Sequence, residues 1–221
     1  MNRKLKFGVI INSDKLSTWK VNCLEELLNQ KDVELDLVVQ VPNRTNKLEL
    51  NFKYFFWYIY NYFFIKRSKS SHLIDTKKIF EGKKRIFCSP IKFGKYSIKF
   101  SNNDIQKIKS YELDFILRFS IGEIIKGDIL TSSKYGIWSF HMGDDQEYRG
   151  KAPGFWEIYN YERKTGAILQ KLTEKLDGGV ILKKGYIDTI NTSYIKNRDK
   201  IHFSVKKWLN IIIENIRPIV F

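Results

Sequence analysis

Cysteine and histidine are scarce in this 221-residue chain, which has two of the first and three of the second. Neither Cys23 nor Cys88 belongs to a Cys-x-x-Cys pair, and His72 and His202 have no partner at a metal-ligand spacing. The sequence therefore predicts no disulfide framework and no metal site, and it favours a reducing cytoplasm. Both cysteines lie in apolar patterns, so we expect them to be core residues.

Long apolar segments are also missing from the sequence. No stretch reaches the roughly 18–20 uncharged apolar residues of a membrane-spanning helix. The basic start of the chain leads into an apolar run, Leu5–Ile11, that is too short for a signal peptide. These absences predict a cytoplasmic protein.

Acidic residues are outnumbered by basic ones, with 24 Asp and Glu against 39 Lys and Arg, for a formal net charge of +15. Such an excess points to an anionic partner: a nucleotide, a phosphorylated sugar, a nucleic acid or an acidic lipid surface. A general preference for Lys on solvated surfaces explains the same excess, and the many Ile and Asn residues fit that interpretation.

The apolar patterns predict one α/β domain over residues 1–221. Two buried strands, Leu5–Ile11 and Leu35–Val41, flank a helix that begins at Ser17 or Thr18, which is the opening of a parallel sheet. Further strands are expected near Lys84–Cys88, Leu113–Ser120, Lys134–His141, Thr165–Glu174 and Gly178–Asp188, with helices at Asn102–Glu112 and about 194–217.

An aromatic-rich insert over about 48–72 interrupts this pattern. Aromatic side chains fill almost every position of Tyr54–Phe64, and Lys66, Arg67 and Lys69 follow. Three interpretations stay open: a helix half-buried against the domain, a contact in a homodimer, or a segment lying on an acidic membrane surface such as the inner membrane face.

Ser139 and His141 stand two residues apart at the end of the strand pattern YGIWSFHM. Because side chains alternate across a strand, Ser139 and His141 share one face, while Trp138 and Phe140 share the other. Ligands bind at the carboxyl edge of open parallel sheets, so the pair is a candidate site. A hydrogen-bonded structural histidine is the alternative that these residues leave open.

The segment beginning at Ser139 resembles the catalytic domain of folate-dependent formyltransferases, a group that includes methionyl-tRNA, glycinamide-ribonucleotide and sugar N-formyltransferases. The family pattern is Asn-x-His, Ser-Leu-Leu-Pro, Tyr-Arg-Gly, a Pro, a Trp, a Thr-Gly strand, and a loop Asp before Gly and an aliphatic strand. The residues of this chain that stand in that order are His141, Tyr148, Arg149, Gly150, Pro153, Trp156, Thr165, Gly166 and Asp177. The resemblance covers Asp114–Gly185 most specifically, and it implies a Rossmann-like formyltransferase fold, with a mostly parallel sheet flanked by helices.

The resemblance also implies a reaction, the transfer of a formyl group from 10-formyltetrahydrofolate to a primary amine. The tetrahedral oxyanion of that reaction needs aimed donors, and the attacking nitrogen must lose a proton. By resemblance, His141 donates to the oxyanion or relays a proton, Asp177 orients the imidazole and accepts the amine's proton, and Ser139 occupies the position of the family's Asn. The residues that match the family's pterin-lining segment are Ile121, Gly122, Glu123 and Ile124.

Two departures from the family pattern bear on the substrates. Ser139 is shorter than Asn, although its hydroxyl can still donate. The apolar Ser-Leu-Leu-Pro becomes Gly-Asp-Asp-Gln, so that Asp144 and Asp145 either hold the amine or sugar hydroxyls of the acceptor or form a solvated loop. Arg149 either binds an acceptor phosphate or braces its loop.

These residues lead us to expect a small, anionic amine acceptor, an amino sugar on a nucleotide or lipid carrier in glycan biosynthesis. The chain is shorter than methionyl-tRNA formyltransferases with their additional β-barrel, so no nucleic-acid acceptor is expected. Two alternatives remain. One is an enzyme of the same fold, a transferase or hydrolase, with a changed donor or reaction. The other is a noncatalytic membrane-associated protein of glycan assembly.

Overall fold

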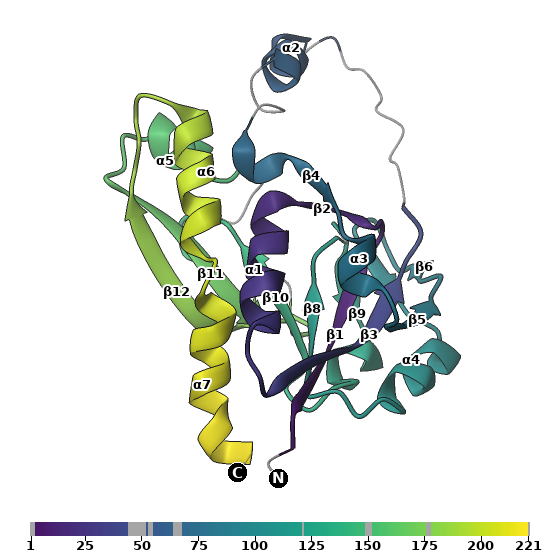
Figure 1. Ribbon diagram of the computed structural model, residues 1–221. Coiled ribbons are helices and arrows are strands. Elements are labelled where there is room, and N and C mark those ends of the chain that lie inside the picture. The colour runs from purple at the N-terminus through teal and green to yellow at the C-terminus, as the bar shows by residue number, and fades with distance from the viewer. Residues whose placement is uncertain are drawn as a thin grey trace.

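Seven strands form the central sheet of the protein, seen in a computed structural model that describes residues 3–43, 52, 55–63, 68–120, 122–148, 152–175 and 178–220 (Figure 1). The strand order is β12-β11-β10-β8-β1-β3-β5. The strands are β1 (Leu5–Ile11), β3 (Val33–Gln40), β5 (Lys84–Phe87), β8 (Phe115–Arg118), β10 (Ile137–His141), β11 (Lys164–Lys171) and β12 (Val180–Asp188). The first five in chain order pair in parallel, whereas β11 and β12 are antiparallel. The prediction of a Rossmann-like, mostly parallel sheet is confirmed.

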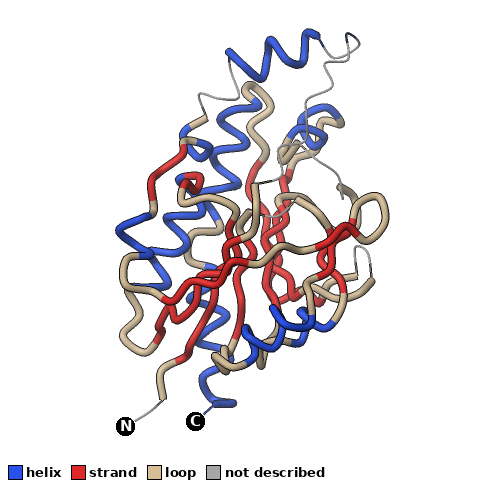
Figure 2. The backbone as a smooth tube through the Cα atoms, turned by 90° about the vertical axis from the view of Figure 1, so that its right-hand side faces the viewer, coloured by secondary structure: helices blue, strands red, loops and turns tan. Residues whose placement is uncertain are grey.

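Helices α1 (Thr18–Leu28), α6 (Tyr194–Ser204) and α7 (Trp208–Val220) cover one face of this sheet (Figures 1 and 2). Helix α1 follows Ser17, as the sequence predicted, and its buried stripe includes Trp19, Cys23, Leu24 and Leu27. These side chains pack with the inward-facing residues of β1, β8, β10 and β11 in one apolar cluster. The burial of this stripe, rather than helix propensity alone, stabilises the helix.

The other face is covered by α4 (Asn102–Lys109) and a small sheet of β6 (Ile91–Lys92), β7 (Ser97–Lys99) and β9 (Ile124–Lys126). The hydroxyl of Ser101 accepts the Asp104 N–H at 3.1 Å and so caps α4. Cys88 packs in this second cluster and Cys23 in the first, so both cysteines are core residues, as predicted.

The shorter elements lie at the edges of these layers. They are β2 (Lys15–Ser17), α2 (Phe55–Phe63), η3 (Lys69–Ser71), β4 (Leu73–Asp75), α3 (Lys77–Phe80), η4 (Asp128–Thr131) and α5 (Phe155–Tyr159). Strands β2 and β4 pair as an antiparallel ribbon. Helix α2 carries the aromatic insert and stands away from the body of the molecule (Figures 1 and 2).

The single C-terminal helix predicted over about 194–217 is wrong, because the structure has two helices there. Val205 ends α6 with φ −86° and ψ 0°, and the Trp208 N–H donates to the Val205 carbonyl at 3.0 Å. The turn allows both helices to bury their apolar residues: Val205 is fully buried, and α7 packs Leu209 and Ile213 into the same cluster. Among the described residues, no helix has both the length and the hydropathy needed to cross a membrane.

Candidate active site

Strand β10 carries the predicted pair, Ser139 and His141, to the carboxyl edge of the sheet. Trp138 stacks on Phe115 with ring centroids 4.2 Å apart, and Phe140 meets Trp19 edge-on at 5.5 Å. These contacts fix one face of β10 against the helix layer, so Ser139 and His141 lie on the other face, as the alternation predicted. Ser139 is only 3% exposed, and its hydroxyl donates a long hydrogen bond of 3.4 Å to the Phe140 carbonyl. His141 is half-exposed and is the more accessible of the two.

The His141 imidazole is held by the loop that follows β10. Its Nε2 lies 3.1 Å from the Tyr148 carbonyl oxygen, and because a carbonyl only accepts, Nε2 carries the hydrogen. Gly143 makes this contact possible: a Cβ there would lie 2.5 Å from the Tyr148 oxygen and 3.0 Å from Nε2. Among the described residues, Nδ1 has no hydrogen-bond partner. It is therefore the ring atom left to exchange a proton.

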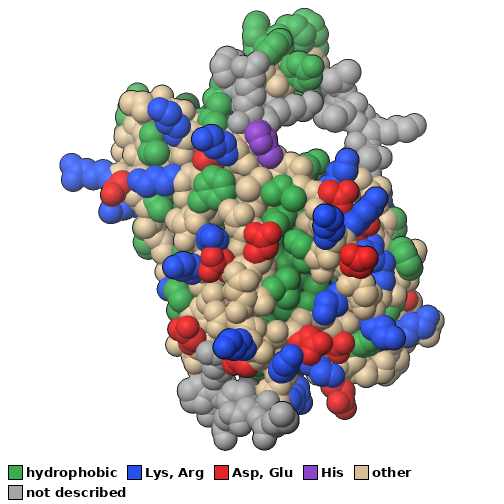
Figure 3. All heavy atoms as spheres, viewed as in Figure 1, with side chains coloured by type: hydrophobic (Ala, Val, Ile, Leu, Met, Phe, Trp, Pro, Cys, Tyr) green, Lys and Arg blue, Asp and Glu red, His purple; other side chains and the backbone are tan. Residues whose placement is uncertain are grey.

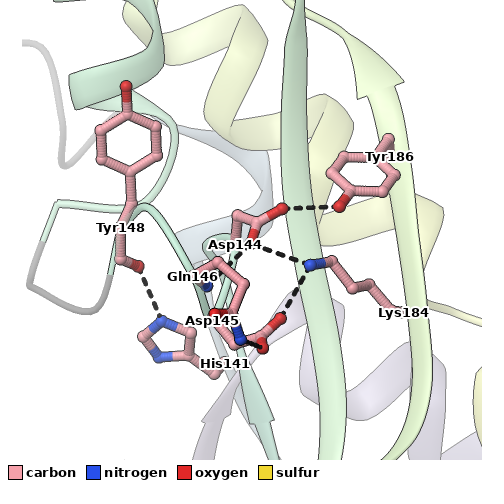
Figure 4. Close-up of polar contacts among 7 residues, drawn as sticks. All are labelled: His141, Asp144, Asp145, Gln146, Tyr148, Lys184 and Tyr186. Carbon is pink, nitrogen blue, oxygen red and sulfur yellow. Dashed lines mark hydrogen bonds and ion pairs between the residues drawn. The ribbon is translucent and has the colours of Figure 1, made fainter.

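Asp144 and Asp145 do not form a solvated loop, because Lys184 of β12 binds both carboxylates (Figure 4). Its Nζ lies 2.8 Å from Oδ1 of Asp144 and 2.9 Å from Oδ1 of Asp145. Tyr186 donates its hydroxyl to Oδ2 of Asp144 at 2.6 Å, and the Gln146 N–H donates to Oδ1 at 2.8 Å. The protein thus holds the acidic pair in one position.

The sheet register explains why Lys184 reaches this loop. His141 pairs with Ile168 on β11, and Ile168 pairs with Lys184 on β12, so the three residues form one row across the sheet. Residues directly opposite each other share a face of the sheet, which places Lys184 on the His141 side. Gly166 of β11 lets the loop pass close, since a Cβ there would lie 3.1 Å from the Asp144 nitrogen.

Lys184 sets the electrostatics of the acidic pair. Burial alone would raise the pKa of Asp144, but the hydrogen bonds from Lys184, Tyr186 and Gln146 outweigh it and lower that pKa to about 2. The hydrogen bond from Lys184 likewise lowers the pKa of Asp145, and the two carboxylates raise the pKa of Lys184. All three groups are therefore charged at neutral pH, and the cluster carries one net negative charge.

The predicted pterin-lining segment follows β8, the strand next to β10. The carboxyl ends of these parallel strands meet at one edge of the sheet, so the segment and His141 lie at the same edge. A Cβ on Gly122 would meet nothing within 4 Å, the Glu123 carbonyl accepts from Arg118 at 3.3 Å, and Ile124 begins β9. Ile121 lies outside the described residues, as do Asp177 and Arg149, so the predicted roles of these three stay predictions.

Two partly buried cations at this edge could not be recognised from the sequence. Lys20 of α1 donates its ammonium to the Phe119 carbonyl, and Arg118 ends β8. Burial, reinforced by the Arg118 charge, lowers the pKa of Lys20 to about 8, and burial also lowers the pKa of Arg118. Among the described residues, neither cation has a carboxylate within ion-pair distance. The sequence indicated only the position of Lys20, because at helical spacing it falls on the same face of α1 as the buried Cys23 and Leu27.

A surface hollow at the opposite, amino-terminal edge of the sheet contains none of the predicted site residues. It is lined by Arg3, Glu112, Lys134 and Lys171, among others. Because ligands of open parallel sheets bind beyond the carboxyl ends of the strands, we place the candidate site at the His141 edge.

Comparison with known proteins bears on the family and the fold. No family model matches the chain. Over 122 residues it is 31% identical to a methionyl-tRNA formyltransferase from Bacillus velezensis, a match that covers 52% of this chain and 38% of that protein. The structure superposes on a phosphoribosylglycinamide formyltransferase from Campylobacter jejuni with a TM-score of 0.66 and 16% identity, over 98% of this chain and 99% of that one. It also superposes on a formyltetrahydrofolate deformylase from Pseudomonas syringae, with a TM-score of 0.58 and 11% identity, over 99% and 62%.

Sequence and fold together support the folate-dependent formyltransferase family. The chain spans well under two thirds of the length of the curated methionyl-tRNA formyltransferases that it matches. What it shares with the family is the α/β domain, and His141 stands at the carboxyl edge of that domain's sheet.

Proposed function

We propose that the chain transfers a formyl group from 10-formyltetrahydrofolate to a primary amine at the carboxyl edge of β8 and β10. The observation that carries this proposal is His141, half-exposed at the end of β10 with Nε2–H fixed on the Tyr148 carbonyl. The imidazole is held in one orientation on a rigid strand, which is what positioned proton transfer requires.

In the proposed reaction, the amine nitrogen bonds to the formyl carbon, and the carbonyl oxygen becomes an oxyanion. Collapse of the adduct breaks the bond between this carbon and N10 of the folate, which takes up a proton as it leaves. His141 acts on both charges through Nδ1, which passes a proton or, once protonated, donates its N–H toward the oxyanion. Asp177 is the base proposed for the proton of the amine.

The loop between β8 and β9 is the proposed site of the folate donor. The open space beside Gly122 leaves room for a planar ring against the backbone. Glu123 and Ile124 already bond through their backbone to Arg118 and Tyr96, so these two residues are held in place before a ligand binds. Residues fixed in advance reduce the ordering entropy that binding must overcome.

An anionic acceptor, such as an amino sugar on a nucleotide or lipid carrier, is the proposed second substrate. Lys20 and Arg118 supply two cations at the same edge, and a phosphate would form charge-assisted hydrogen bonds with them. Oδ2 of Asp144 accepts a hydrogen bond from Tyr186, and its second lone pair can accept a sugar hydroxyl without displacing Lys184 from Oδ1.

The donor is tested by thermal unfolding with saturating tetrahydrofolate. A ligand at 100 times its Kd stabilises the folded state by about 2.7 kcal/mol, so a clear rise in Tm is expected, and no rise would remove the folate assignment. The acceptor is tested by mass spectrometry of amino-sugar nucleotides incubated with the donor, where a gain of one formyl group is expected. Formate release without acceptor would instead show a hydrolase.

A further inference from the structure

Helix α2 presents its most apolar face to solvent. We call the side chains of Phe55, Phe56, Ile59, Tyr62 and Phe63 the aromatic face. At 100° per residue these five positions fall within about 120° of arc, so they form one continuous stripe. Phe56 is 83% exposed and Tyr62 62%, and the remaining three are between 38% and 49% exposed. Hydrophobic side chains accordingly cover α2 in the space-filling view (Figure 3).

The segment that follows α2 is bound firmly to the body of the protein. Asp199 of α6 accepts hydrogen bonds from the Ser68 hydroxyl at 2.5 Å, the Ser70 N–H at 2.9 Å and the Lys69 N–H at 3.1 Å. The Ser70 hydroxyl lies 2.9 Å from Nδ1 of His202. The aromatic face is therefore displayed at a short distance from a fixed point and not on a long free tail.

The sequence that contains the aromatic face has basic residues and no acidic one. From Leu50 to Ile74 the sequence contains four basic residues and no acidic one: Lys53, Lys66, Arg67 and Lys69. The whole chain carries a formal net charge of +15. Such a segment is attracted to anionic surfaces and repelled by a second copy of itself.

We propose that α2 docks the protein on the surface of an anionic lipid bilayer, with the aromatic face in the headgroup region. Aromatic side chains, and Tyr in particular, suit that depth because an apolar ring carries a polar tip. Interfacial helices bind through such an apolar face combined with nearby basic residues. The proposal does not depend on the reaction catalysed.

A second copy of the chain fits this face less well. Aromatic side chains have surface areas of about 150–250 Å² each. With the exposed fractions given above, the five side chains of the aromatic face together expose roughly 600 Å² that a partner could cover. A standard stable interface buries about 800 Å² on each partner. Two copies meeting here would also bring together segments with basic residues and no acidic ones.

Docking through α2 would turn the candidate active site toward the membrane. Helix α2 lies at the end of the molecule to which the carboxyl ends of the parallel strands point (Figure 1). Exposed aromatic residues of α5, Trp156 and Tyr159, lie near this end as well. The ring of Tyr194 on α6 meets Phe155 of α5 edge-on at 5.7 Å, so α5 packs against α6 at this end.

Flotation of the full chain with lipid vesicles tests the proposal. The vesicles are phosphatidylcholine alone, or phosphatidylcholine mixed with phosphatidylglycerol, at low and high salt. The variant Phe56→Ser, Tyr62→Ser, Phe63→Ser removes the aromatic face, and Phe87→Ser, Ile91→Ser, Tyr96→Ser removes a comparable exposed set on the β5–β7 side. Matched circular dichroism and Tm for both variants establish that each is folded.

Wild type and the β5–β7 variant should float with the anionic vesicles, more weakly at high salt, while the aromatic-face variant loses at least about tenfold in partitioning. Equal flotation of both variants would overturn the proposal, and so would absence of wild-type flotation. Light scattering of the lipid-free protein identifies the competing occupant. A wild-type dimer that the aromatic-face variant converts to monomers would assign this face to a second copy.

Discussion

His141 of β10 and His202 of α6 differ in their solvent exposure and in their contacts. His202 is 4% exposed, stacks on Trp19 with ring centroids 5.1 Å apart, and lies beside Ser70 and Asp199. His141 is half-exposed at a strand end, with a single backbone hydrogen bond. We call Ser70, Asp199 and His202 the buried centre. A serine, a histidine and an aspartate are also the residue types of a hydrolase triad. Here, however, their hydrogen bonds connect η3 to α6.

This difference teaches that residue types alone do not identify a catalytic site. At the buried centre the hydrogen bonds of Asp199 and Ser70 serve the fold, and the imidazole of His202 is only 4% exposed. At the β10 edge the His141 imidazole is partly exposed, and the fold holds it and the acidic pair in place through Gly143 and Lys184. The following predictions test this contrast from the largest expected effect to the smallest.

Removing the carboxylate of the buried centre should destabilise the protein strongly. Asp199→Ala removes the shared acceptor of three donors, those of Ser68, Lys69 and Ser70, and should lower the free energy of unfolding by about 2–4 kcal/mol. His141→Ala loses one half-exposed hydrogen bond and should lower it by about 1 kcal/mol or less. Urea denaturation measures both, and equal losses would contradict the contrast.

Stability should fall with acid because of His202. Burial, reinforced by the charge of Arg198, lowers the pKa of the folded imidazole to about 3, whereas an unfolded histidine titrates near 6.5. The unfolded chain therefore binds a proton that the folded chain does not, and stability declines as the pH falls from 6.5 toward 3. The expected slope is up to about 1.4 kcal/mol per pH unit. Urea denaturation between pH 7 and 5 should show a flatter slope for His202→Gln, and an unchanged slope would refute this assignment.

Lys184→Met should loosen the acidic loop. It removes the cation between two half-buried carboxylates, and we expect a loss of about 1–2 kcal/mol in the free energy of unfolding. In wild type the lowered pKa of Asp144 stabilises the fold above pH 4, and that contribution disappears as the pH falls from about 4 to 2. NMR titration should show the pKa of Asp144 rising in Lys184→Met. If it stays near 2, Lys184 is not the cause.

Ser139→Ala should have the smallest effect. Its hydroxyl is buried and makes one long hydrogen bond, so we expect less than about a tenfold loss of transfer rate. A loss of a hundredfold or more would show that the hydroxyl reaches the oxyanion after all, in the role that the sequence pattern predicted.

Much of the fold could be predicted from local pattern. The apolar runs of β1, β3, β8 and β10 and the stripe of α1 are each determined by neighbouring residues. The break between α6 and α7 could not be predicted, because apolar residues continue on both sides of Val205 and join one cluster in the fold.

Some contacts of the candidate site could also be predicted from the sequence, and others could not. His141 ends β10 and the acidic pair follows shortly after it, so their proximity could be predicted. Lys184 lies 40 residues after Asp144, and its contact depends on the pairing of β11 with β12 and on the close approach at Gly166. Lys20 and Phe119, the residue after β8, are 99 residues apart, and the fold brings them together.

The central claim is that the accessible histidine, and not the buried one, serves formyl transfer. The direct measurement follows a ¹³C-labelled formyl group from 10-formyltetrahydrofolate to an amino-sugar nucleotide by mass spectrometry, with wild type, His141→Asn and His202→Gln compared at pH 7. We expect transfer by wild type and by folded His202→Gln, and a loss of at least about 100-fold in His141→Asn. Transfer by His141→Asn at the wild-type rate would contradict the account.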